Sequence, residues 1–263
     1  MRGRAIRISP ARRLVIDFMR LSRDIPLVSV ERRMRLEPVV RARSECAQRP
    51  LWMSIFTKAY GTVSRNFPEL RRAYVKLPWP HFYEYAKPVA MLPLGIEYCG
   101  EEGIFTIRIG NPGAMRLTDI DSRIRNAKAA PIEKVADFRR LQRISRLPLP
   151  VRYPLQWLGL NLGRQRANFF GTFLIGGVSE LGIESQHMLS PISNSLSYGV
   201  IGPDGDVNVR MYWDHRVMDG AVVGRALAQM ERTLNGEIAD ELRETPTRSG
   251  KAAQRRFGPT SDF

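Results

Sequence analysis

The chain has 263 residues, 43% of them hydrophobic, so it is long enough to bury a sizeable core in one large domain or two small ones. Its 2 cysteines, Cys46 and Cys99, stand far apart, which excludes a disulfide framework or a cysteine metal site and fits a reduced, cytoplasmic protein. No apolar run approaches the roughly 20 residues of a membrane-spanning helix. The basic N-terminal segment lacks the apolar core of a secretion signal.

The net charge of +15 comes almost entirely from two stretches, residues 1–49 and residues 123–146. Such charge attracts nucleic acid, an anionic membrane or a phosphorylated cofactor, although a charge run is more often a solvated helix face. The chain carries no recognised nucleic-acid motif, so we do not expect nucleic acid as its partner.

In the first half of the chain, the patterns predict helices and strands in alternation. Ser9 and Pro10 are typical of a helix start, with the serine as cap and the proline in the first turn. Apolar residues at even steps predict a strand over residues 28–36. Helical spacing then predicts helices over residues 38–47 and 51–67, and branched residues predict strands over 89–97 and 104–109.

In the second half, two basic helices are predicted over residues 118–130 and 131–147, and a helix over 156–166. Strands are predicted over residues 171–175, 198–201 and 207–213, with a hairpin turn at 203–206. A helix follows over 221–234 and is expected to stop at Gly236. Strands and helices mix without a regular βαβ rhythm, which favours one α+β domain over residues 1–242 and a disordered polar tail over 243–263.

The most informative stretch is Asp-His-Arg-Val-Met-Asp-Gly, residues 214–220. His215 lies between the strand over 207–213 and the next helix, a place where a side chain is held rigidly and still faces a cavity. An imidazole titrates near neutrality, so a positioned histidine can take a proton from a thiol, a hydroxyl or an amine. Asp219, near the helix start, is favoured there by free N–H groups. His81 and His187 have no such motif, and a surface or structural role is expected for each.

This heptapeptide resembles the signature of the catalytic domain of 2-oxoacid dehydrogenase dihydrolipoyl acyltransferases, which share a fold with chloramphenicol acetyltransferase. Further segments match the family in the correct order: Ser9 to Met19, Lys58-Ala59, Phe67-Pro68-Glu69-Leu70, Gly171-Thr172-Phe173, Pro191-Ile192, Asn194 and Gly202. The resemblance spans about residues 9–238. It implies a two-layer domain with a mixed central sheet.

The resemblance also implies roles for individual residues. His215 would be the general base of an acyltransferase that uses an acyl thioester of coenzyme A, with the basic stretches near its phosphates. Asp219 would pair with Arg12, or less well with Arg13, as a structural support. Asp214 would fix the turn and Gly220 would complete the motif. No metal is implied. No lipoyl attachment is expected in this chain, which begins almost at the catalytic domain.

One departure from the family concerns the oxyanion. The family places a serine or threonine hydroxyl where this chain has Gly176. Losing one such donor typically costs on the order of a hundredfold in turnover. An amide of Gly176 or Gly177, or the side chain of Ser179, would have to substitute. A catalytically impaired scaffold or assembly subunit is therefore the alternative.

The resemblance also predicts how copies of the chain assemble. In the family three copies form a trimer, with each site at a subunit boundary, so we predict a homotrimer. The short strand over residues 171–175 ends in Gly176-Gly177, which lets another backbone approach closely. Trp52 and Trp157 are predicted to be core residues, and both cysteines packed thiols.

Overall fold

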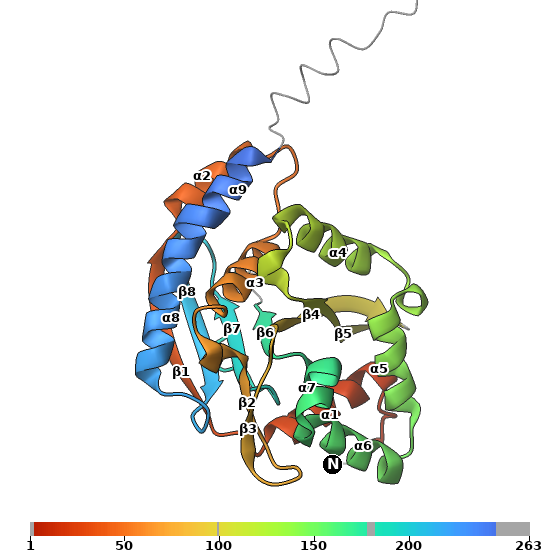
Figure 1. The fold of residues 1–263 in the computed structure, drawn as a ribbon. Helices are drawn as coiled ribbons and strands as arrows, with labels where there is room; N and C mark the ends of the chain where they lie inside the picture. Colours follow the sequence, from red (N-terminus) through yellow and green to blue (C-terminus); the bar gives the residue numbers. More distant parts are fainter. Residues whose placement is uncertain (1–2, 99, 178–181, 246–263) are drawn as a thin grey trace, which may run out of the picture.

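The computed structural model describes residues 3–98, 100–177 and 182–245. A mixed 6-stranded sheet with the order β1-β8-β7-β6-β4-β5 forms its centre (Figure 1). Its strands are β1 (Leu27–Arg35), β4 (Val89–Tyr98), β5 (Glu101–Gly110), β6 (Phe173–Gly176), β7 (Asn194–Tyr198) and β8 (Asp206–Asp214). β6 runs parallel to β4 and β7, and the other pairs are antiparallel. A separate hairpin joins β2 (Arg72–Val75) to β3 (His81–Glu84).

Helices surround this sheet (Figure 1). They are α1 (Pro10–Ser22), α2 (Glu37–Glu45), α3 (Trp52–Val63), α4 (Leu117–Ala129), α5 (Ala136–Arg146), α6 (Leu149–Asn161), α7 (Gly163–Phe170), α8 (Gly220–Thr233) and α9 (Ala239–Glu244). Single turns of 3-10 helix lie at Pro68–Arg71, Pro112–Ala114 and Ile132–Lys134. The Ser9 hydroxyl caps α1 by accepting the Arg12 amide at 3.0 Å, as predicted.

The main core lies between the sheet and helices α3, α4 and α8. Tyr60 of α3 stacks on Phe173 of β6 with ring centroids 4.0 Å apart, and Phe56 stacks on Tyr198 of β7 at 4.5 Å. A smaller apolar cluster around Leu174 covers the other face of β6. The central strands are therefore buried on both faces, which gives the ends of β6 and β8 a rigid base.

The predicted α+β class, the mixed sheet and most elements are confirmed. The strand predicted over residues 198–201 is wrong, because β7 occupies Asn194–Tyr198. Its buried polar residues, among them Ser195 and Ser197, conceal the apolar alternation of a strand. The helix predicted over 51–67 ends at Val63, and the one predicted over 156–166 is divided between α6 and α7 by the extended residue Leu162.

The predicted stop at Gly236 is also wrong. The chain continues through a π-helical turn, Leu234–Ile238, into α9, because Leu234 and Ile238 are fully buried in the core. α9 lies beside α2 and runs to Glu244, beyond the predicted domain end at residue 242 (Figure 1). Residues 246–263 of the predicted tail lie outside the described residues, as does Cys99. Cys46 is buried, as predicted.

Candidate active site

His215 occupies a turn that backbone bonds fix on several sides. β8 ends at Asp214 and α8 begins at Gly220. The amide of His215 donates to the carbonyl of Pro26 at 3.2 Å, and the Trp213 indole N–H donates to the Met218 carbonyl at 2.9 Å. The side chain of His215 is 52% exposed. An imidazole on a fixed backbone thus faces solvent.

Asp214 anchors the turn from inside. Its carboxylate is buried and accepts three hydrogen bonds from Arg216, from the amide at 3.1 Å, Nε at 2.8 Å and Nη2 at 2.7 Å. These bonds to Asp214 raise the pKa of Arg216 above its ordinary value. The guanidinium of Arg216 also lies over the Tyr74 ring, 4.5 Å from its centroid. The turn is therefore tied to the β2–β3 hairpin.

A second arginine, the buried Arg166, supports the same region. Arg166 of α7 donates to the carbonyls of Tyr74 at 3.1 Å and Pro191 at 3.0 Å. Burial lowers the pKa of Arg166, partly offset by Tyr85 and Asp214. The Asp214 amide donates to the carbonyl of Ser193 at 2.8 Å. Ser193 follows Pro191 by two residues, so Arg166 and Asp214 bind the same short segment. Sequence reasoning missed both arginines. Arg216 lies inside the heptapeptide, but the sequence does not show that it binds Asp214. Arg166 belongs to no motif.

The predicted pairing of Asp219 is wrong. Asp219 is the N-cap residue of α8 without a capping side-chain bond, and its Oδ1 lies 3.8 Å from His215 Nδ1. Arg12 instead pairs weakly with Glu101, at 3.9 Å. The reason is topological: α1 packs its first turns against β5, at the opposite edge of the sheet from β8. Arg13, the second candidate, lines a hollow between α1 and α6.

The glycine positions differ in what they require. Gly220 opens α8, and a Cβ there would meet only the Trp213 ring, at 3.9 Å. A Cβ on buried Gly176 would lie 3.3 Å from side-chain atoms of Leu174 and Pro93. Gly177 is exposed. Ser179, the remaining oxyanion candidate, lies outside the described residues.

Strand register separates His215 from the Gly176-Gly177 pair within one chain. Gly176 pairs with Ser197 of β7, and Ser197 pairs with Arg210 of β8. Arg210 precedes His215 by five residues, which at the usual strand rise is about 16 Å. One chain therefore places the candidate base well away from the candidate oxyanion amides along the strand direction, with Gly176 level with the middle of β8.

No group of His, Cys, Asp and Glu side chains in the described part of the chain is arranged to hold a metal ion. None of the helices in the described ranges is long and apolar enough to cross a bilayer.

Comparison with known proteins identifies the fold. No family model and no curated protein matches the chain. A dihydrolipoamide acetyltransferase of Azotobacter vinelandii matches with a TM-score of 0.63 at 13% identity, over 92% of this chain and 94% of that one. A truncated catalytic core of the 2-oxoacid dehydrogenase complex of Thermoplasma acidophilum matches with a TM-score of 0.62 at 15% identity, over 89% and 99%. A chloramphenicol acetyltransferase matches with a TM-score of 0.53 at 14% identity, over 88% and 99%. The chain thus has the fold of these acyltransferase cores, as its sequence signature predicts.

Proposed function

We propose that this protein is an acyltransferase that moves an acyl group from a coenzyme A thioester to an acceptor, with His215 as general base. The observation that carries the proposal is the half-exposed His215 imidazole on a turn fixed by Asp214, in the fold of acyltransferase cores. The Azotobacter enzyme has been investigated for the catalytic roles of a histidine and of an asparagine four residues later. His215 and Asp219 have the same spacing.

The proposed chemistry is a single acyl transfer. His215 takes the proton from the acceptor's thiol, hydroxyl or amine, and the freed lone pair attacks the thioester carbonyl. The amide N–H groups of Gly176 and Gly177 would stabilise the oxyanion that forms. The carbon–sulfur bond then breaks, and the imidazolium returns its proton to the coenzyme A thiolate. Coenzyme A is a substrate here, and basic side chains of residues 1–49 and 123–146 would hold its phosphates.

The proposed site is shared between copies of the chain. Because His215 and Gly176 are separated by about 16 Å along the sheet, they can serve one carbonyl only if they come from different subunits. A homotrimer with three equivalent sites satisfies this requirement. One matching structure is the cubic core of the pyruvate dehydrogenase complex, which is itself an assembly.

The direct test is acyl transfer from a panel of acyl-coenzyme A donors to thiol, hydroxyl and amine acceptors. His215→Ala is expected to lower turnover by at least about a hundredfold, since it removes the base. His187→Ala is the matched control, because His187 is exposed and lies beside Tyr212 of β8, outside the turn of residues 214–220. Calorimetric titration with coenzyme A should show unchanged binding in both variants. Near wild-type turnover in His215→Ala would show that His215 is not the base.

A catalytically impaired scaffold is the second candidate, favoured by the missing hydroxyl at Gly176. Gly176→Ser supplies the hydroxyl, and Gly176→Ala adds the same Cβ crowding against Leu174 and Pro93 without it. A gain in rate with serine alone would show that the site lacks only this donor. Absence of turnover in the wild type and in both variants, with partner binding retained, would favour the scaffold.

A further inference from the structure

The orientation of α6 is the reverse of that of an ordinary surface helix. Its polar residues Arg152, Gln156 and Asn161 are buried, whereas every exposed residue of the helix is apolar. The exposed residues are Leu149, Pro150, Val151, Pro154, Leu155, Trp157 and Leu158. A surface helix normally buries its apolar stripe and exposes its charges. An outward apolar face of this kind marks a surface that a membrane or another molecule covers.

The inward polar side of α6 is fixed by specific bonds to α1. Arg152 Nε lies 2.8 Å from Asp17 Oδ2, and Gln156 donates to the same carboxylate at 2.8 Å. Arg20 in turn donates to Gln156 at 2.9 Å and lies over the Tyr153 ring. Rotating α6 to bury its leucines would break this buried network. The apolar side is therefore held outward.

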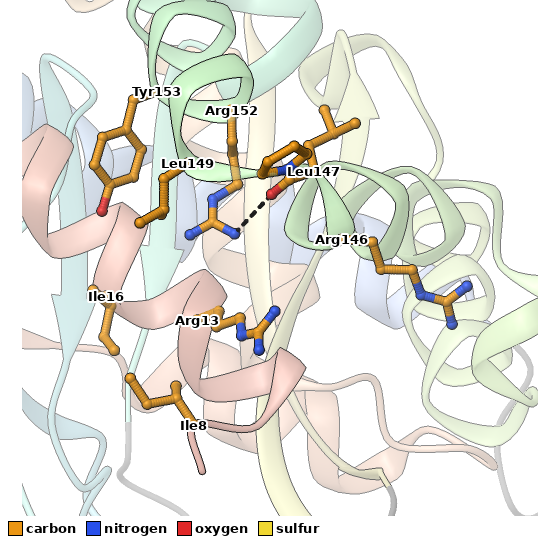
Figure 2. Close-up of a pocket in the computed structure, with 9 residues that line it drawn as sticks. Ile8, Arg13, Ile16, Arg146, Leu147, Leu149, Arg152 and Tyr153 are labelled. Carbon is orange, nitrogen blue, oxygen red and sulfur yellow. Dashed lines mark hydrogen bonds between the residues drawn. The ribbon is translucent and has the colours of Figure 1, made fainter.

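The apolar surface continues from α6 onto the N-terminal segment. A hollow of about 480 Å³ opens between α1 and the α5–α6 junction (Figure 2). Figure 2 shows Ile8 and Ile16 on one side of this hollow and Leu149 and Tyr153 on the other. Ile8, Ile16 and Leu149 are all exposed.

Cations accompany this apolar surface. Arg13 and Arg146 line the hollow, and neither has an ion-pair partner among the described residues. Arg139 and Arg143 of α5 and Arg4 and Arg7 of the N-terminal segment are also exposed. The surface thus combines the outward leucines and tryptophan of α6 with unpaired arginines of α1, α5 and the N-terminal segment, and apolar side chains together with cations favour the interface of an anionic membrane.

We propose that α6 and the adjoining N-terminal segment dock the protein on the surface of an anionic lipid bilayer. The apolar face enters the boundary between headgroups and acyl chains, and the arginines bind lipid phosphates. α6 lies in the plane of the membrane, since none of the described helices is long enough to cross it. A second copy of the chain is a poorer occupant, because a chain with a net charge of +15 offers these arginines fewer carboxylates than an anionic bilayer offers phosphates.

Vesicle flotation of the full chain tests the proposal. The wild type is expected to float with phosphatidylcholine vesicles that contain about 30 mol% phosphatidylglycerol and to stay behind with neutral ones. Leu155→Ser/Leu158→Ser should weaken partitioning by about tenfold or more. Arg13→Gln/Arg146→Gln should weaken it by about fivefold for each charge. Brominated lipids should quench the wild type more than Trp157→Phe.

Ile104→Ser is the matched control, because Ile104 is a comparably exposed apolar residue on β5. It should float like the wild type, and so should His215→Ala, which separates this inference from the proposed activity. Failure to bind anionic vesicles, or binding that the double serine variant leaves unchanged, would overturn the proposal. A fall in oligomer mass in that variant, without an effect on flotation, would show that α6 contacts another copy instead.

Discussion

Asp214 is the residue on which the geometry of the His215 turn depends. It is fully buried, binds both the backbone and the guanidinium of Arg216, and sits close enough to Arg166 to offset the effect of burial on that arginine's pKa. A buried carboxylate without such partners would be strongly destabilising. Its position is therefore a consequence of three elements meeting at one point: β8, α7 and the β2–β3 hairpin.

We predict that Asp214→Ala lowers the free energy of unfolding by about 2–4 kcal/mol, because Arg216 loses its charged acceptor and the buried Arg166 loses a nearby negative charge. Urea denaturation followed by circular dichroism measures this. Asp119→Ala is the control: Asp119 forms an exposed pair with Arg116 at 3.2 Å, and its loss should cost less than about 0.5 kcal/mol. Equal losses in the two variants would contradict a special role for Asp214.

Asp219 has a smaller predicted role. It is 85% exposed, and the distance of 3.8 Å to His215 Nδ1 is too long for a hydrogen bond. We expect Asp219→Asn to keep the turn and to lower turnover by less than about tenfold, since exposed ion pairs contribute little. Steady-state kinetics of Asp219→Asn checks this, with Arg12→Gln as a control whose turnover is expected to equal that of the wild type. A hundredfold loss would mean that Asp219 orients the imidazole when the site is complete.

At the scale of elements, the contact between α1 and α6 depends on buried charge. The side chains of Asp17 and Arg152 are 3% and 5% exposed. We predict that Asp17→Ala costs about 3–5 kcal/mol, because it leaves the Arg152 guanidinium buried and unpaired. Thermal denaturation provides the measurement. Asp17→Ala/Arg152→Met should recover part of the loss; a double variant no more stable than the single one would contradict a direct pair.

Sequence patterns predict some of these elements correctly and misplace the exposed face of α6. The alternation along residues 207–213 and the Ser9-Pro10 cap predict β8 and α1, because local rules agree there with tertiary packing. Trp157 is predicted as core but is 41% exposed. That prediction assumes that an apolar residue points inward. The ion pair between Asp17 and Arg152, which are distant in sequence, instead fixes which face of α6 points inward.

The site was only partly predictable for a similar reason. The heptapeptide places His215 on a strand-to-helix turn, and the structure shows this turn. The partner of Asp219 was beyond the reach of the sequence, because it depends on which edge of the sheet α1 covers. The prediction placed β7 a few residues too late, because the buried serines of this strand hide the alternation of apolar residues. The helix does not end at Gly236, because the burial of Leu234 and Ile238 in the core outweighs the low helix propensity of glycine.

At the scale of the whole molecule, the account requires two chains for each reaction. His215 and the Gly176-Gly177 amides are separated by about 16 Å along the strand direction, as the strand register shows. The outward face of α6 is a separate surface, with its own proposed occupant. The base His215 and the apolar face of α6 belong to different elements, so His215→Ala and Leu155→Ser/Leu158→Ser test catalysis and docking independently.

Acyl transfer by two co-expressed inactive variants tests whether each active site is shared between two chains. His215→Ala removes the base. Gly177→Asp places a carboxylate, at an exposed position, beside the proposed oxyanion amides. Each variant alone should be inactive. At a 1:1 ratio of the two variants, the randomly assembled trimers together should regain about one quarter of wild-type turnover, because on average one site in four combines an intact base with an intact neighbouring wall. Turnover in His215→Ala alone, or no recovery in the verified mixed trimers, would contradict the account.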